Sequence, residues 1–161
     1  MQGQTDIPIE EIGIKEAEQL AKLLEVEQID FVYSSNLKRA VMTAKIIAES
    51  RGIDVREDSR LRECLFGLIE GHTVEEAILK FGKDVFRHDV DDFSTYDLGI
   101  YGGENREQVL ERHLSFLNEA KEKHSSETIL IVGHGRSLNT LLHGLGLPVN
   151  LKRGEYIKIE Y

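Results

Sequence analysis

The stretch that decides the fold is TILIVGHGRS, residues 128–137. Its first five residues form an uninterrupted apolar and β-branched run, which is typical of a strand buried on both faces of a parallel sheet. A turn follows in which glycines flank His134, and residues 136–145 then have the pattern of a helix. A strand that leads through a glycine turn into a helix is the repeating unit of layered α/β folds.

The same alternation of strand and helix recurs outward from this stretch. Residues 29–34 and, more weakly, 54–61 predict further strands, and the alternating residues 155–161 predict a last one. Helices are predicted over residues 10–24, 37–50, 73–81 and 105–123. Ser35 or Asn36 is the expected N-cap of the second helix, and Thr73 with Glu76 fits a capping box at the start of the third. Residues 82–103 are predicted to form a loop or lid. We therefore expect an α/β fold, a three-layer α/β/α sandwich with a mostly parallel sheet, in a single domain over residues 1–161.

Composition excludes several classes of protein. The 20 Lys and Arg residues are outnumbered by 29 Asp and Glu, for a net charge of −9, which argues against a nucleic-acid-binding surface. A small cationic pocket for one phosphate group stays compatible with this charge. Cys64 is the single cysteine, so intramolecular disulfides and cysteine metal clusters are excluded. With no long apolar run and no signal pattern at Met1, we expect a soluble, cytoplasmic protein without a membrane partner.

Three loops follow predicted strands, at the sheet edge where α/β folds bind ligands. The first carries Arg39 in the first turns of a helix, where a guanidinium can clamp phosphate oxygens. The second carries Glu63 among apolar residues, where partial burial would raise its pKa and suit it to donate a proton. The third carries His134 between glycines that let a ligand approach closely. Singly, Arg39 and Glu63 are as well explained as surface residues, but together the three indicate phosphoryl transfer.

Five segments, taken in order, resemble the histidine phosphatase superfamily, also called the phosphoglycerate mutase-like family. They are QGQTDIPIEEIG (residues 2–13), SSNLKRAVMTA (34–44), Glu63 with the FG and EG pairs at 66–67 and 70–71, GGEN (102–105) and VGHG (132–135). The resemblance implies that Arg39 binds phosphate, that Glu63 is the proton donor and that His134 is the second catalytic histidine. It also implies that Gly3, Gln4 and Gly135 contribute to substrate binding.

The reaction implied by the resemblance is hydrolysis of a small phosphorylated metabolite through a phosphohistidine intermediate. It needs neither a metal nor another cofactor, and a homodimer is compatible with it. The short segment between Glu70 and Gly102 favours a small phosphatase. In contrast, Gly135 and the three residues after it are similar to the version found in mutases of the family.

The family's first motif, an Arg-His-Gly after the first strand, occurs nowhere in the 161 residues. In the family it supplies the nucleophilic histidine and half of the phosphate clamp. Three interpretations stay open: the sequence is shorter than the natural protein, it is a catalytically inactive phosphate-binding or scaffolding relative, or another segment or partner fills the gap. We expect the first strand of the family's sheet to be missing from this chain, which would leave unpaired backbone groups beside the phosphate site.

Other chemistries fit less well. A cysteine phosphatase needs an arginine six residues after its cysteine, and that position after Cys64 holds Glu70, so we expect a small buried thiol. The histidines lack metal-ligand spacing, and we expect no metal site. His113 and His124 lie in a charged helical context and are predicted to face solvent.

Overall fold

A three-stranded parallel sheet forms the centre of the protein. The computed structural model describes residues 1–86, 93–148 and 150–160. The strands are β1 (Phe31–Ser34), β2 (Val55–Glu57) and β3 (Ile129–Val132), in the order β2-β1-β3. Both neighbours run parallel to β1, which pairs Tyr33 with Arg56 on one side and with Ile131 on the other. The expected α/β class and parallel sheet are confirmed.

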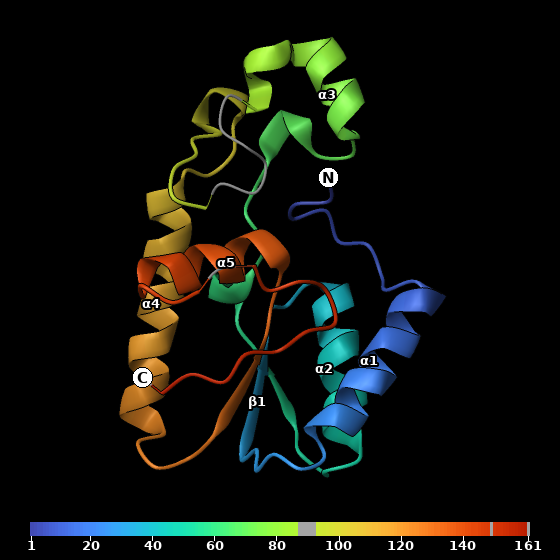
Figure 1. The fold of residues 1–161 in the computed structure, drawn as a ribbon, viewed down its shortest axis with the longest axis vertical. Helices are drawn as coiled ribbons and strands as arrows, with labels where there is room; N and C mark the ends of the chain where they lie inside the picture. The colour runs from blue at the N-terminus through green and yellow to red at the C-terminus, as the bar shows by residue number, and fades with distance from the viewer. Residues whose placement is uncertain (87–92, 149, 161) are drawn as a thin grey trace.

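Helices cover both faces of this sheet, as Figure 1 shows for α1 and α2 on one side and α4 on the other. The helices of the described residues are α1 (Glu11–Leu24), α2 (Lys38–Glu49), α3 (Val74–Phe81), α4 (Arg106–Lys123) and α5 (Gly135–Gly144). Successive side chains of a strand point to opposite faces, and the packing follows this alternation. Val32, Leu130 and Val132 pack with the α2 residues Ala44 and Ala48. Tyr33, Ile129 and Ile131 pack instead with Phe116 and Ala120 of α4.

A third apolar cluster lies beyond the carboxyl ends of the strands, around α3 at the top of Figure 1. It includes Cys64, Ile69 and Ala77 and is joined to α4 through Val109. The predicted capping box begins α3, because the Thr73 hydroxyl accepts the Glu76 N–H while the Glu76 carboxylate accepts the Thr73 N–H. The predicted buried thiol is also confirmed: Cys64 is fully buried.

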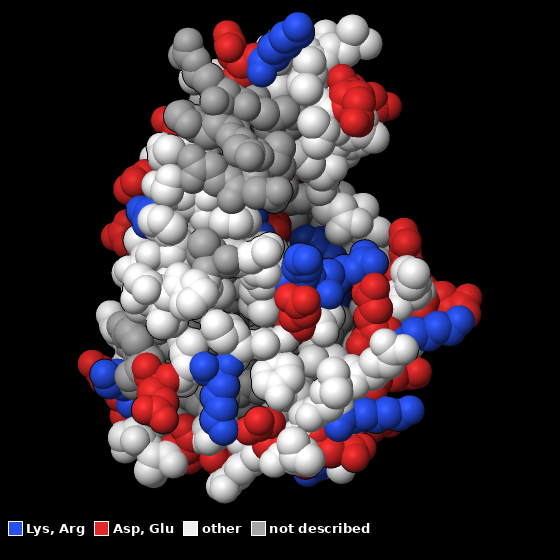
Figure 2. Space-filling model, in the orientation of Figure 1, with Lys and Arg blue, Asp and Glu red and all other residues white. Residues whose placement is uncertain are grey.

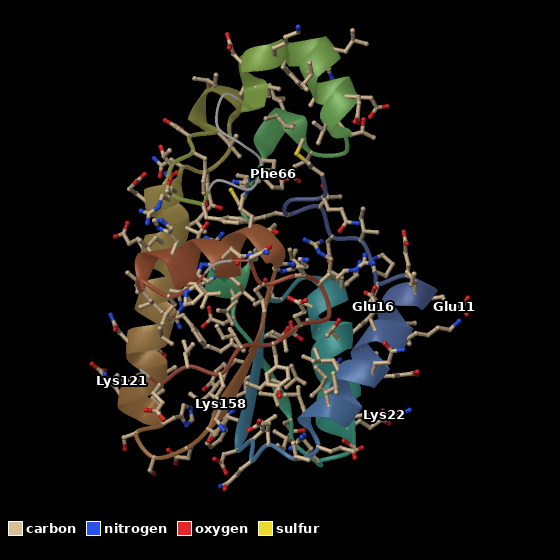
Figure 3. All side chains as sticks on the ribbon, in the orientation of Figure 1. Glu11, Glu16, Lys22, Phe66, Lys121 and Lys158 are labelled. Carbon is tan, nitrogen blue, oxygen red and sulfur yellow. The ribbon has the colours of Figure 1, made fainter. Side chains whose placement is uncertain are left out.

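Two strand predictions need correction. All four residues of β3 are only half-buried, because β3 lies at the end of the strand order and its outer edge has no strand partner among the described residues. Residues 155–160 form no strand. This segment is fastened by ion pairs instead: Arg153 binds Glu16, and Lys158 binds Glu27 just beyond α1. Figure 3 labels Glu16 and Lys158.

The histidine and N-cap predictions also need correction. His113 is fully buried on α4, which packs on the sheet through Phe116 and Ala120 and also contacts α5. His124 is half-buried, since its ring packs on Phe31. The N-cap of α2 is Leu37 without a side-chain cap, although the Ser35 hydroxyl accepts the Leu37 N–H at 3.3 Å.

Candidate active site

The predicted site residues follow the carboxyl ends of the strands. Arg39 lies in the first turn of α2, directly after β1, and His134 is the N-cap residue of α5, directly after β3. Glu63 follows the 3₁₀ turn Ser59–Leu61 that succeeds β2. Lys and Arg side chains gather in the hollow between the sheet region and the part around α3 (Figure 2). The fold thus brings the three predicted loops to one edge of the sheet.

The Glu63 carboxylate binds the N-terminus of α5. Its Oε1 accepts the Ser137 N–H at 2.9 Å and its Oε2 accepts the Arg136 N–H at 3.2 Å. The Cys64 N–H also donates to Oε1, at 2.8 Å. The first N–H groups of a helix attract anions, so Glu63 occupies a position that suits a negatively charged oxygen.

Arg39 holds the segment Met1–Asp6, which we call the N-terminal strap. Its guanidinium donates to the carbonyl oxygens of Gly3 at 2.6 Å and Thr5 at 2.8 Å. Burial lowers the pKa of Arg39, and the charges of Glu63 and nearby acidic residues oppose that effect. Since arginine stays charged in proteins, the site contains a partly buried cation whose donors bind oxygen atoms.

Glu70 fixes the other side of the strap. Its Oε1 accepts the Gln4 N–H at 2.9 Å, and its Oε2 accepts the Thr5 hydroxyl at 2.7 Å. Gly3 is fully enclosed and has a φ of +51°, and a Cβ added there would meet Glu70 Oε1 at 2.1 Å. The strap therefore requires glycine at position 3 for two independent reasons.

The side chain of Gln4 links the strap to the loop that carries Glu63. Its Nε2 donates to the Glu63 carbonyl at 3.1 Å, and its Oε1 accepts from Arg62 at 3.4 Å. Gln4 and Gly3 thus lie beside Arg39 and Glu63, and their role in substrate binding stays a prediction. Gly135 is exposed at the first position of α5, with open space where a Cβ would stand.

His134 is buried at the base of the site. Only 8% of its surface is exposed, and its Nε2 has no hydrogen-bond partner among the residues that the structure describes. Burial, with the positive charge of Arg39 as the next cause, lowers its pKa to about 3. At neutral pH His134 is therefore an uncharged imidazole that can donate from one ring nitrogen and accept at the other.

The sequence analysis missed a partly buried ion pair that supports the Glu63 loop. Arg112 of α4 donates to the carbonyls of Arg60 and Arg62, both at 2.6 Å, and of Glu63 at 3.0 Å. Its Nε also binds Glu104 at 2.9 Å, and both side chains are 17% exposed. Glu104 in turn accepts the Leu65 N–H. The sequence showed the GGEN motif that contains Glu104, but no sequence pattern marked its partner Arg112, which lies eight residues further along on α4.

The described residues contain no group of three or more His, Cys, Asp or Glu side chains placed to hold a metal ion. A hollow of about 210 Å³ lies beside the strap, lined by Met1, Gln2, Thr5, Ile7 and residues 71–73. None of Arg39, Glu63 and His134 lines it. In this conformation the Arg39 guanidinium and the first N–H groups of α5 instead donate to the chain's own oxygen atoms.

A model of the histidine phosphatase superfamily (branch 1) matches residues 1–160. The chain belongs to the histidine phosphatase superfamily. Two curated relatives are a phosphoserine phosphatase 1 from Hydrogenobacter thermophilus, 36% identical over 133 residues, and a "Probable phosphoglycerate mutase" from Proteus mirabilis, 34% identical over 154 residues. These alignments cover 83% and 95% of this chain.

The solved structure of YhfR from Bacillus stearothermophilus superimposes with a TM-score of 0.79 at 33% identity. That match covers 92% of this chain and 73% of YhfR. The phosphoglycerate mutase-like fold predicted from the sequence is confirmed. The chain spans 62% of the length of the phosphoserine phosphatase and 70% of the mutase relative. No described helix is long and apolar enough to cross a membrane.

Proposed function

We propose that this chain carries the phosphate-binding and proton-donating part of a histidine phosphatase that hydrolyses a small phosphomonoester. One observation carries the proposal. The donors expected to hold phosphate, the Arg39 guanidinium and the first N–H groups of α5, already bind oxygen atoms of the strap and of Glu63. A phosphate group presents the same kind of acceptor with more negative charge, so it can replace these oxygens.

Each residue has a distinct role in this proposal. Arg39 and the α5 N-terminus bind the equatorial phosphate oxygens, and the neutral His134 donates a hydrogen bond to one of them. Glu63 leaves the α5 N–H groups as phosphate arrives, takes up a proton and passes it to the leaving oxygen. Arg112 and Glu104 hold the backbone of the Glu63 loop through this change.

The chemical step needs a histidine nucleophile. A histidine nitrogen attacks phosphorus while the bond to the leaving oxygen breaks, and water then hydrolyses the phosphorus–nitrogen bond. The family motif that supplies this histidine, Arg-His-Gly, does not occur in the 161 residues. We therefore expect the 161-residue chain by itself to bind phosphate without turning over a phosphate ester.

Two measurements on the same samples test this function: titration calorimetry with inorganic phosphate, and p-nitrophenyl phosphate hydrolysis without added metal. Arg39→Ala and His134→Ala should each weaken phosphate binding by about tenfold or more, as expected for loss of a charge-assisted or buried hydrogen bond. Arg56→Ala is the control, because Arg56 is exposed on β2 over the Phe31 ring. Absence of phosphate binding, or equal binding by all four proteins, would refute the proposed site.

A non-catalytic phosphate-binding protein is the second candidate, favoured by the missing Arg-His-Gly. Hydrolysis separates the two candidates once the nucleophile is supplied. An N-terminal extension that ends in Arg-His-Gly should create turnover if the remaining site is catalytically competent. The inactive-relative hypothesis predicts phosphate binding without turnover in the same extended protein.

A further inference from the structure

Arg62 directly precedes the proposed proton donor Glu63, and its side chain connects the segments that form the candidate site. Its Nε donates to the side-chain oxygen of Asn36 at 2.7 Å, and its Nη1 donates to that of Gln4 at 3.4 Å. Asn36 belongs to the loop between β1 and α2, and Gln4 belongs to the N-terminal strap. The guanidinium therefore lies where three segments of the site meet. No sequence motif assigned a role to Arg62.

Arg62 and Arg39 contact the same short piece of the strap. Arg39 donates to the carbonyl oxygens of Gly3 and Thr5. Arg62 donates to the side chain of Gln4, the residue between them. The two guanidiniums thus reach neighbouring residues at one edge of the sheet, where Lys and Arg side chains gather in the hollow of Figure 2.

The hydrogen-bond partners of Arg62 are neutral, which distinguishes it from the arginines around it. Arg60 pairs with the carboxylate of Asp58, and Arg112 pairs with that of Glu104. Within the described part of the chain, Arg62 forms no ion pair, and its Nη2 has no hydrogen-bond acceptor. Amide oxygens orient a guanidinium but do not neutralise it, so the charge of Arg62 can act on an anion that enters the site.

Both ends of the Arg62 residue are held in place. Its carbonyl oxygen accepts from Arg112 at 2.6 Å, and its Nε is bound by Asn36. A guanidinium bound through Nε keeps its two Nη groups for another acceptor. The Gln4 contact at 3.4 Å is longer than an ordinary hydrogen bond, so a stronger acceptor can replace it at little cost. Phosphate oxygens match such a pair of donors.

We propose that Arg62 is a second cation of the phosphate site, whose Nη groups bind one phosphate oxygen while Arg39 binds another. This inference rests on the proposed function, because it adds a residue to the same site. A phosphate ester carries about 1.5 to 2 negative charges at neutral pH, which one arginine does not balance. The Glu63 carboxylate adds to that negative charge, and a second guanidinium lowers the electrostatic cost of bringing phosphate beside it. Gln4 loses its contact with Arg62 but keeps its bond to the Glu63 carbonyl.

Titration calorimetry with inorganic phosphate at two pH values tests the role of Arg62. The ligand is mostly a dianion at about pH 8 and mostly a monoanion at about pH 5.5. We expect Arg62→Met to weaken binding by about tenfold at the higher pH, as for one lost charge-assisted hydrogen bond. At the lower pH the loss should be only about threefold, because the Coulomb energy falls with the charge of the ligand. Arg62→Lys keeps the charge without the planar fork and should give a smaller loss than Arg62→Met.

Arg51→Met is the matched control. Arg51 also donates to neutral oxygens, the carbonyls of Leu24 and, at 3.1 Å, of Glu27, but it follows α2 at the end away from Arg39. This variant should bind phosphate like the unaltered chain at both pH values. Thermal unfolding of each variant without ligand, at both pH values, checks that the fold is intact.

A second measurement needs no substitution at Arg62. The unaltered chain is labelled with ¹⁵N-arginine, and the guanidinium signals are followed by NMR during a phosphate titration. Phosphate should shift the signals of Arg62 and Arg39 and leave those of Arg51 unchanged. Arg62 signals that stay unchanged at saturating phosphate would overturn the inference even if Arg62→Met does not fold.

The outcomes distinguish this inference from the proposed function. A loss in Arg62→Met that is equal at both pH values, or no larger than in Arg51→Met, would refute the contact between Arg62 and phosphate. The phosphate site itself would stand in that case if Arg39→Ala still weakens binding. Equal losses in Arg62→Lys and Arg62→Met would assign Arg62 to holding Asn36, which also refutes the inference. If the unaltered chain does not bind phosphate at either pH, the phosphate site and the role of Arg62 are both refuted.

Discussion

Replacing Arg112 with methionine is expected to destabilise the protein by about 3 kcal/mol, because it leaves a mostly buried carboxylate without its cation. Glu104 is 17% exposed and loses the Arg112 Nε contact at 2.9 Å. The carbonyls of Arg60, Arg62 and Glu63 lose a donor at the same time. For a chain of this size, such a loss corresponds to a melting temperature lower by roughly 6–12 °C.

A double-mutant cycle isolates the energy of the ion pair between Arg112 and Glu104. Glu104→Gln removes the charge but keeps an acceptor for the Leu65 N–H, so the double variant Glu104→Gln/Arg112→Met should recover on the order of 1 kcal/mol relative to the sum of the single losses. Urea unfolding followed by circular dichroism measures all four proteins. Lys15→Met is the control, since Lys15 and Glu11 form an ion pair that is 66% and 83% exposed, and its loss should cost less than about 1 kcal/mol.

If Arg112→Met lowered the free energy of unfolding no more than Lys15→Met does, Arg112 would not support the Glu63 loop. The explanation by an ion pair would also be wrong if the losses at Glu104 and Arg112 were strictly additive, because a shared ion pair requires them to be coupled.

Three further predictions follow from single sites. His113 is fully buried, and burial lowers its pKa to about 4, so the unfolded chain takes up a proton before the folded chain does as the pH falls. The free energy of unfolding should therefore drop by up to about 3 kcal/mol between about pH 6.5 and pH 4. Urea unfolding at pH 7 and pH 5 should show a smaller drop for His113→Gln than for the unaltered chain. Gly3→Ala should weaken phosphate binding and stability more than Gly52→Ala, because both glycines have positive φ but only Gly3 has Glu70 in the way; equal effects in calorimetry and urea unfolding would contradict the strap geometry. Burial raises the pKa of the Cys64 thiol to about 12, so Cys64 should react with a thiol reagent only after unfolding, and rapid labelling of the folded chain would contradict its burial.

Local patterns predicted most of the fold because they act over a few residues. The capping box at Thr73 and Glu76 and the apolar run before His134 correspond to the start of α3 and to β3. Burial depends on what packs from elsewhere in the chain, and it was predicted correctly for Cys64 but wrongly for His113 and for β3. His113 looked solvent-facing among charged neighbours, yet it lies on the face of α4 that meets the core. Residues 155–160 alternate like a strand but have no strand beside them.

The sequence predicted where the main residues of the candidate site lie, but not the residues that support them. Arg39, Glu63 and His134 each follow a strand, so the rule for parallel sheets was enough to bring them to one edge. The contacts of Arg112 reach back 49 to 52 residues to the Glu63 loop, and no local pattern encodes such a distance. The contacts of Arg62 likewise reach 26 residues back to Asn36 and 58 residues back to Gln4, which only the fold brings together.

The central claim is that the buried His134 and the α5 N-terminus form a phosphate site, and histidine ring signals report on it directly. The chain is labelled with ¹⁵N-histidine and titrated with inorganic phosphate while the ring nitrogens are followed by NMR. We predict that the His134 signals shift with phosphate, while those of His124, which lies beside Phe31, do not. Unchanged His134 signals at saturating phosphate, or equal shifts at both histidines, would contradict the account.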